Sequence, residues 1–174
     1  MLKLARDVYE LIRHVLQEDG REFKSKCGGY WCQFKFTLPL HDSCTDCLHY
    51  EIRFIDDFYL VYTHSEFQAD LHDKQKMWNL ATFLLQANQK LYDGDFQMDF
   101  QSGEICLEIL HKCDGHVPSE IIIREDIENS AHAFEIYGWG IAGILADEFT
   151  TADQAFEFCR GVRLEHLNEF INNL

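Results

Sequence analysis

The spacing of apolar residues alternates between a helical and a strand period along the chain, and each change marks the boundary of a predicted element. Apolar residues recur at helical spacing over 4–16, which predicts an amphipathic helix that ends near Gly20. Alternation over 30–38 and 48–54 predicts two half-buried strands, and a third strand begins at Phe58. Short turns join these strands, so they predict an antiparallel meander, because parallel neighbours need a crossover of about a dozen residues.

A second block of elements follows the same logic. It comprises a helix over 77–91 that Gly94 caps, a hairpin of strands over 96–100 and 105–109, a helix capped by Ser119, and a last helix that starts at Thr150 or Thr151. The predicted order is α-β-β-β-α-β-β-α-α. Each amphipathic element must bury its apolar side against another layer. The sequence therefore predicts an α+β fold in which helices pack on one face of a five-stranded antiparallel sheet. We expect a single domain over 1–174, with 150–174 as a C-terminal helical extension.

The helix over 77–91 has a wider apolar arc than a surface helix requires. A surface helix needs an apolar stripe of about 100°, but here the arc extends through Trp78, and Phe83 lies outside the main stripe. Contact with a second subunit and cover by the terminal helices both account for this width. On the first interpretation, Trp78, Phe83 and Leu85 are the candidates for partner binding or dimer contact.

Composition and charge narrow the classes of function. The chain has 174 residues, 47% of them hydrophobic, and its length suffices for a core without disulfides or metal. Thirty acidic residues against fifteen basic ones give a net charge of −15. That field repels nucleic acid and anionic membranes and favours partners with basic segments. Seven cysteines, with neither a signal peptide nor a membrane-spanning stretch, predict a cytoplasmic protein.

A cysteine pair early in the chain has the spacing of half a zinc site. Cys44 and Cys47 are three positions apart and His49 is close by, so the second half would come from Cys27 and Cys32. These two pairs flank the first predicted strand, and ten extended residues cover roughly 33 Å. One metal ion cannot reach both pairs, and the sequence predicts a loop between strands instead.

A second candidate metal group follows the fifth predicted strand. His111, Cys113 and His116 offer three ligands within six residues. They are weak candidates, because the paired pattern that identifies a zinc site is missing. We assign no metal and no cofactor from the sequence.

A literal GxGxxG occurs at Gly138, Gly140 and Gly143. A dinucleotide-binding motif must follow a strand inside a βαβ unit, whereas this segment is predicted to be helical. We expect small residues that allow close helix packing. The carboxylate pairs fall at predicted turns or helix ends, where solvated acids are usual. No catalytic residue is assigned, and the protein is predicted not to be an enzyme.

The stretch over 78–145 resembles a known family. A helix and hairpin read LLQANQKLYDGDFQMDFQSGEICLEIL, and a helix follows the sequence PSE. This order of helix, strand, glycine turn, strand and helix is similar to that of the YbjN-like family, whose members are described as presumed bacterial sensory-transduction regulators. That family is placed within the type III secretion chaperone-like fold. The resemblance implies protein binding by acidic homodimers that hold partner segments in extended form. It carries over no catalytic residues.

The leading hypothesis is therefore a cytoplasmic, non-enzymatic protein-binding or regulatory module that is secretion-chaperone-like and acts as a homodimer. Its partner is a protein or a second copy, with no nucleic acid and no membrane. Two rivals remain open: a small metal-binding enzyme that uses His111, Cys113 and His116, and an acidic immunity-type inhibitor of a basic toxin.

Overall fold

The computed structural model describes residues 2–40 and 43–172. This part of the chain contains four helices and six strands. In chain order they are α1 (Lys3–Glu18), β1 (Phe23–Cys27), β2 (Trp31–Pro39), β3 (Cys47–Ile55), β4 (Phe58–Gln68), α2 (Lys74–Asn88), β5 (Asp95–Met98), β6 (Glu104–Lys112), α3 (Glu120–Leu145) and α4 (Ala152–Asn172). The α+β class is confirmed.

All six strands form one sheet in the order β1-β2-β3-β4-β6-β5, and every neighbouring pair is antiparallel. The predicted meander is confirmed in β2, β3 and β4. Asp56 and Asp57 form the two-residue turn between β3 and β4, and Asp56 takes a φ of 57°, which this tight connection requires.

The prediction of five strands is wrong, because it omits β1. This strand pairs with β2 along its whole length, from Phe23 opposite Phe36 to Cys27 opposite Cys32. It lies at the edge of the sheet, and most of its residues are exposed. Lys24 and Lys26 occupy it, as is common in edge strands that avoid pairing with other chains. A strand with so few apolar residues produces no alternation that sequence analysis could recognise.

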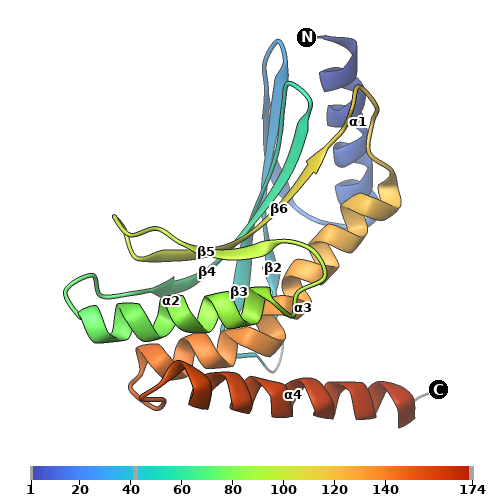
Figure 1. Cartoon of the computed structure of the whole chain (residues 1–174). Coiled ribbons are helices and arrows are strands. Elements are labelled where there is room, and N and C mark those ends of the chain that lie inside the picture. The colour runs from blue at the N-terminus through green and yellow to red at the C-terminus, as the bar shows by residue number, and fades with distance from the viewer. Residues whose placement is uncertain (1, 41–42, 173–174) are drawn as a thin grey trace.

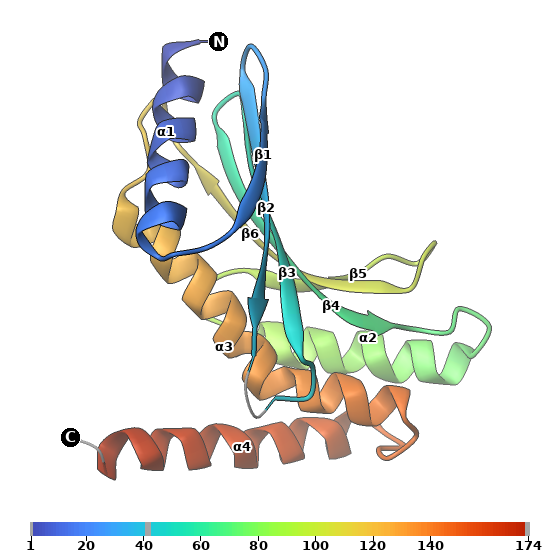
Figure 2. The same ribbon diagram turned by 180° about the vertical axis from the view of Figure 1, so that it is seen from behind.

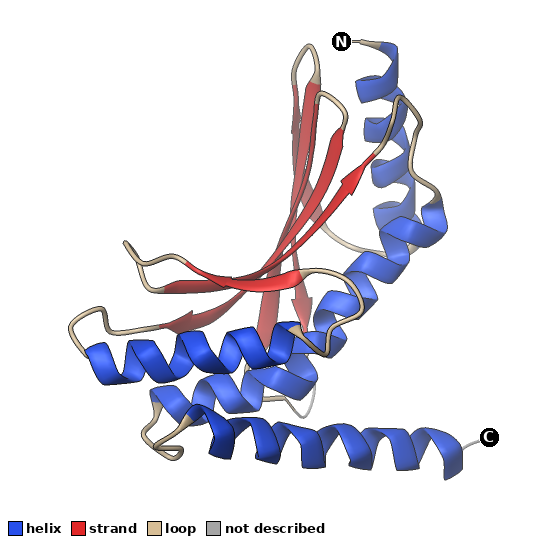
Figure 3. Cartoon of the chain, viewed as in Figure 1, coloured by secondary structure: helices blue, strands red, loops and turns tan. Residues whose placement is uncertain are grey.

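The helices cover one face of the sheet, as predicted. Figure 1 and the reverse view in Figure 2 show α1 and α3 along one side of the strands, with α2 at their lower end and α4 below α2 and α3. Figure 3 separates the sheet from these helices by colour. Because α4 packs on α2 and α3 rather than on strands, it adds a further layer. The covered face of the sheet contributes these buried side chains to the hydrophobic core: Cys32, Phe34, Phe36, Leu48, Tyr50, Ile52, Phe54, Tyr59, Val61, Ile105, Leu107 and Ile109.

The buried side of helix α2 differs from the apolar stripe that the sequence predicts, which comprises Met77, Leu80, Ala81, Leu84, Leu85, Asn88 and Leu91. Its buried residues are Leu80, Phe83, Leu84 and Ala87. Phe83 is fully buried, so it is not available to a partner in this structure and leaves the set of candidate contact residues. Helix α2 ends at Asn88 rather than at a Gly94 cap. Gly94 instead lies against the backbone of Glu108 with a φ of 77°.

The glycines at 138, 140 and 143 lie inside α3 and not in a nucleotide-binding loop. A Cβ on Gly140 would lie 2.3 Å from the Phe83 ring, and one on Gly143 would lie 2.3 Å from the Phe149 ring. The prediction that these small residues allow close helix packing is confirmed. The predicted cap is confirmed as well, since Ser119 Oγ accepts a hydrogen bond from the backbone N–H of Ile122.

Candidate functional site

The opposite face of the sheet is open, since none of the described helices packs on it. Its side chains come from the alternate positions of the same strands. The register aligns them in rows across the sheet, one of which runs from Thr37 through His49 and His64 to Cys106 and Gln97. An antiparallel sheet with one solvated face usually carries polar residues there, and here these include histidines and cysteines.

A charged network occupies the middle of this face around Glu51. Lys35 Nζ lies 2.8 Å from Glu51 Oε2, and both Gln33 and Arg53 donate hydrogen bonds to Glu51 Oε1. The Arg53 guanidinium also lies over the ring of Tyr62. These neighbours leave Glu51 only 8% exposed although none of the described helices covers it. Burial by itself would raise the pKa of Glu51, but the hydrogen bonds from Arg53, Lys35 and Gln33 outweigh it and lower the pKa to about 2.

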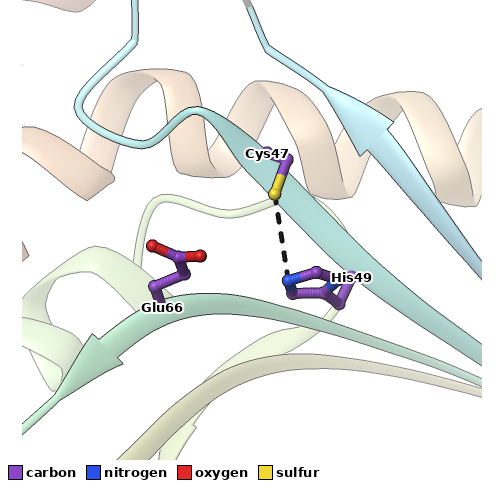
Figure 4. A group of neighbouring side chains, drawn as sticks. All are labelled: Cys47, His49 and Glu66. Carbon is purple, nitrogen blue, oxygen red and sulfur yellow. Dashed lines mark hydrogen bonds between the residues drawn. The ribbon is translucent and has the colours of Figure 1, made fainter.

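Beside this network, Cys47, His49 and Glu66 bring three possible metal ligands together. Their ligand atoms all lie within 4.8 Å of one another, and Cys47 Sγ is 3.8 Å from His49 Nε2. Figure 4 shows Cys47 and His49 on the same strand and Glu66 on the neighbouring strand, with the three side chains directed toward one another. Cys47 is half-buried, and the other two side chains are exposed.

The orientation of the His49 ring is set from its other nitrogen. His49 Nδ1 lies 3.2 Å from Thr37 Oγ1 on β2. This contact leaves Nε2 directed at the cysteine. A ring nitrogen held by an outer partner is the usual arrangement for a histidine that binds metal through the other nitrogen. Burial raises the pKa of the Cys47 thiol, and the carboxylates of Glu66 and Asp46 raise it further.

A second histidine follows in the same row. His64 is the cross-strand partner of His49, and its Nδ1 lies 3.1 Å from Glu104 Oε1. Burial lowers the pKa of His64 against the opposing effect of Glu104. A surface hollow is lined by residues that include Thr37, His49, His64 and Glu104, so this part of the face is open to solutes.

The weak metal-ligand candidates from the sequence, His111, Cys113 and His116, are not brought together. Within the described residues, His111, Cys113 and His116 do not form a group whose ligand atoms lie within reach of one ion. His111 points to the covered face, where its Nε2 lies 3.0 Å from Asp126 Oδ1 on α3. Burial raises the pKa of Asp126 to about 6, although the contact with His111 acts to lower it. His111 therefore joins the sheet to α3.

Cys47 and His49 are close in the sequence, but the sequence pattern does not identify Glu66 as their neighbour. The two-residue turn at Asp56 and Asp57 fixes the register in which β3 pairs with β4, and this register brings Glu66 near. It sets Ile55 opposite Phe58, and the register continues to His49 opposite His64. The paired register ends there, and one further step of two residues on each strand leads to Cys47 and Glu66. On its other side, β4 pairs with β6, and that ladder shifts register between His64 and Gln68, so β4 is irregular around Glu66.

One other group has ligand spacing within the described residues. It consists of His14 and Glu18 on α1 with Glu120 on α3, all exposed. Glu18 already pairs with Arg124, whose Nη2 lies 2.8 Å from its carboxylate. This group joins two helices, and exposed carboxylates with their ion pairs need no metal.

The two remaining candidates for partner contact lie on the outer surface of α2. Trp78 is 71% exposed and Leu85 is 66% exposed. They are seven residues apart, so they lie on one side of the helix two turns from each other. Thr82 lies between them, and its hydroxyl donates to the backbone carbonyl of Trp78 at 2.9 Å. We call Trp78, Thr82 and Leu85 the α2 outer row.

Comparison with known proteins supports the fold and gives no function. No protein-family model matches the sequence, and no curated protein matches it. The fold is similar to that in a crystal structure of an uncharacterized protein from Methanothermobacter thermautotrophicus, with a TM-score of 0.53 and 15% identity over 82% of this chain and 99% of that one. Among the described residues, no helix is both long and apolar enough to cross a membrane.

Proposed function

We propose that the protein is a non-enzymatic, secretion-chaperone-like protein-binding module that acts as a homodimer, with α2 as the contact between the two copies. The observation that carries this proposal is the exposed α2 outer row. The other sides of α2 are occupied, because its core residues pack inward, Asn79 donates to the carbonyl of Thr150, and Gln86 donates to Asp153 at the start of α4. The exposed large apolar side chains of α2 are therefore those of the outer row, Trp78 and Leu85.

The chemistry of the outer row suits burial. The Thr82 hydroxyl is already bonded to the Trp78 carbonyl, so an interface would bury its methyl group without leaving an unpaired donor. Trp78 and Leu85 flank the small pair of Ala81 and Thr82 symmetrically. Two α2 helices that cross antiparallel at this pair would place each Trp78 against the partner's Leu85. Such reciprocal contact is what a two-fold interface requires.

The charge of α2 supports a second copy as the occupant. The net charge of −15 makes two copies repel each other over most of their surfaces. Helix α2 has no acidic residue between Lys74 and Asn88, and it carries Lys74 and Lys76. Contact through this helix therefore avoids the like-charge repulsion that an average surface of the protein would meet.

The expected dimer is weak. Burial of four large side chains contributes about 6 to 12 kcal/mol. Association costs about 4 to 15 kcal/mol in lost translational and rotational freedom. At the favourable ends of both ranges about 8 kcal/mol remains, which corresponds to a dissociation constant of about 1 μM. Micromolar association is therefore the tightest that this contact allows, and we expect a concentration-dependent dimer. The open face of each sheet then remains free for a partner protein.

Sedimentation velocity of the full chain, from low to high micromolar concentration, tests this proposal. The wild-type protein is expected to shift toward the dimer with concentration, and Trp78→Gln combined with Leu85→Gln should remain monomeric. The matched control is Tyr92→Gln with Phe100→Gln, which removes two exposed aromatic side chains outside α2. A wild-type protein that stays monomeric at high micromolar concentration, or equal effects of both double variants, would contradict the proposal.

A further inference from the structure

We propose that Cys47, His49 and Glu66 bind a divalent transition-metal ion of the zinc class on the open face of the sheet. This site is separate from the α2 outer row and does not depend on dimer formation. It differs from both metal groups that the sequence suggests, because its third ligand comes from the strand next to the cysteine and histidine.

The distances between the ligand atoms fit one small ion. Zinc binds sulfur at about 2.3 Å and histidine nitrogen or carboxylate oxygen at about 2.0 to 2.2 Å. In a tetrahedral centre these bonds set neighbouring ligand atoms about 3.4 to 3.6 Å apart. Cys47 Sγ and His49 Nε2 are already 3.8 Å apart, and all three ligand atoms lie within 4.8 Å of one another. A shift of about an ångström by the flexible Glu66 side chain completes three positions of a tetrahedron.

The donor set selects the class of ion. Sulfur, imidazole nitrogen and carboxylate oxygen together suit zinc, whereas magnesium and calcium prefer oxygen ligands alone. The Cys47 thiol gives its proton to solvent when it binds the ion. A thiolate and a carboxylate then balance the charge of a divalent cation, and the fourth position is left to water or an incoming ligand. Without a cation, Glu66 and Asp46 oppose ionisation of this thiol.

Neighbouring residues fix the positions of Cys47 and His49 in the absence of an ion. Cys47 and His49 lie on β3, whose pairing with β2 is continuous from Cys47 to Ile55. Thr37 on β2 holds His49 Nδ1, which leaves Nε2 for the metal. Sites built on strands keep their geometry better than sites built on loops. The cluster is therefore arranged before the ion arrives.

The other thiols and imidazoles near these segments are used differently. Cys44, which completes the CxxC motif, lies against α3, where its Sγ is 4.0 Å from the carbonyl oxygen of Phe134. A Cβ placed on Gly138 would lie 2.5 Å from that sulfur. His111 pairs with Asp126 on the covered face. These contacts make Cys44 and His111 matched controls for Cys47 and His49.

Titration of metal-free full-length protein with Zn²⁺ by calorimetry tests the site, and Co²⁺ is used as a spectroscopic probe of thiolate coordination. We expect one ion per chain and a Co²⁺ spectrum with a sulfur-to-metal charge-transfer band. Cys47→Ser and His49→Ala should each weaken Zn²⁺ binding at least tenfold, and Cys47→Ser should abolish the band. Glu66→Gln should weaken binding to a similar extent.

The control variants decide between this cluster and its rivals. Cys44→Ser and His111→Asn are expected to keep wild-type affinity. Equal losses of Zn²⁺ affinity in Cys44→Ser and Cys47→Ser would assign binding to the CxxC motif and overturn the proposal. Loss of Zn²⁺ affinity in His111→Asn alone would also overturn it. Absence of stoichiometric Zn²⁺ binding by the wild-type protein would also overturn it. Because Cys47, His49 and Glu66 lie outside the core, circular dichroism should show all three ligand variants folded.

Discussion

The two faces of the sheet use the same residue types for different purposes. On the covered face, His111 pairs with Asp126 on α3, and the Tyr50 hydroxyl donates to the carbonyl of Ile127. These polar groups join the sheet to the helix. On the open face, His49 Nδ1 contacts Thr37, and its Nε2 lies 3.8 Å from the Cys47 thiol and close to the Glu66 carboxylate. A histidine near an acid is therefore structural or available for binding according to the face on which the register places it.

The largest expected effect contrasts covered and exposed positions only two residues apart. Phe83 is fully buried against α3, whereas Leu85 is on the α2 outer row. Phe83→Ala should lower the free energy of unfolding by about 3 to 5 kcal/mol, because it leaves a cavity in the core. Leu85→Ala should change the free energy of unfolding by less than about 0.5 kcal/mol. Urea unfolding at a concentration where the monomer dominates measures both, and similar losses would contradict the assignment of the two sides of α2.

The strands differ in how far their burial could be predicted from sequence. In β2 and β3 the outward positions hold charged residues such as Lys35, Glu51 and Arg53, so only one set of side chains could face the core. In β4 both alternating sets are apolar at first, and the pattern beginning at Phe58 does not identify the inner one. The structure buries Tyr59 and leaves Phe58 42% exposed.

The candidate site could be predicted only in part. The predicted strand over 48–54 includes His49 but leaves Cys47 in the loop before it, whereas β3 begins at Cys47 and places both residues on one face. Glu66 is seventeen positions from His49 along the chain, and only the pairing of β3 with β4 brings it near. That pairing follows from the Asp56 turn, so its register could have been inferred. His111, Cys113 and His116 are close in the sequence but, in the described part of the chain, do not form a metal-ligand group. Proximity in sequence does not make side chains at a strand end converge.

An intermediate effect is expected from the residue behind His49. Thr37→Val keeps a β-branched side chain on an exposed strand position but removes the hydroxyl that contacts Nδ1. If Cys47, His49 and Glu66 bind zinc, this change should weaken Zn²⁺ affinity about 10- to 100-fold, as loss of an outer hydrogen-bond partner typically does. Thr37→Ser restores the hydroxyl and should restore affinity. Calorimetric titration of both variants measures the difference, and equal affinities would show that Thr37 does not orient the ring.

The smallest effect concerns the charged network and depends on pH. The folded-state pKa of Glu51, about 2, lies below its ordinary value of 4.5, so its ionised form stabilises the fold. This contribution is complete above the ordinary pKa and is lost as the pH falls through the folded-state pKa. Glu51→Gln should lower the free energy of unfolding by about 1 kcal/mol at neutral pH, since the partners Lys35 and Arg53 are partly exposed.

The difference between wild type and Glu51→Gln should therefore stay constant from pH 7 to about pH 5 and shrink between about pH 4.5 and pH 2 as Glu51 takes up its proton. Asp126→Asn provides the contrast from the covered face. Burial gives the Asp126 carboxyl a raised pKa of about 6, so its ionisation opposes folding as the pH rises toward that value. Urea unfolding across this range should show the two substitutions changing the pH dependence of stability in opposite directions. If both substitutions changed the pH dependence of stability in the same direction, the open-face network would not offset the burial of Glu51.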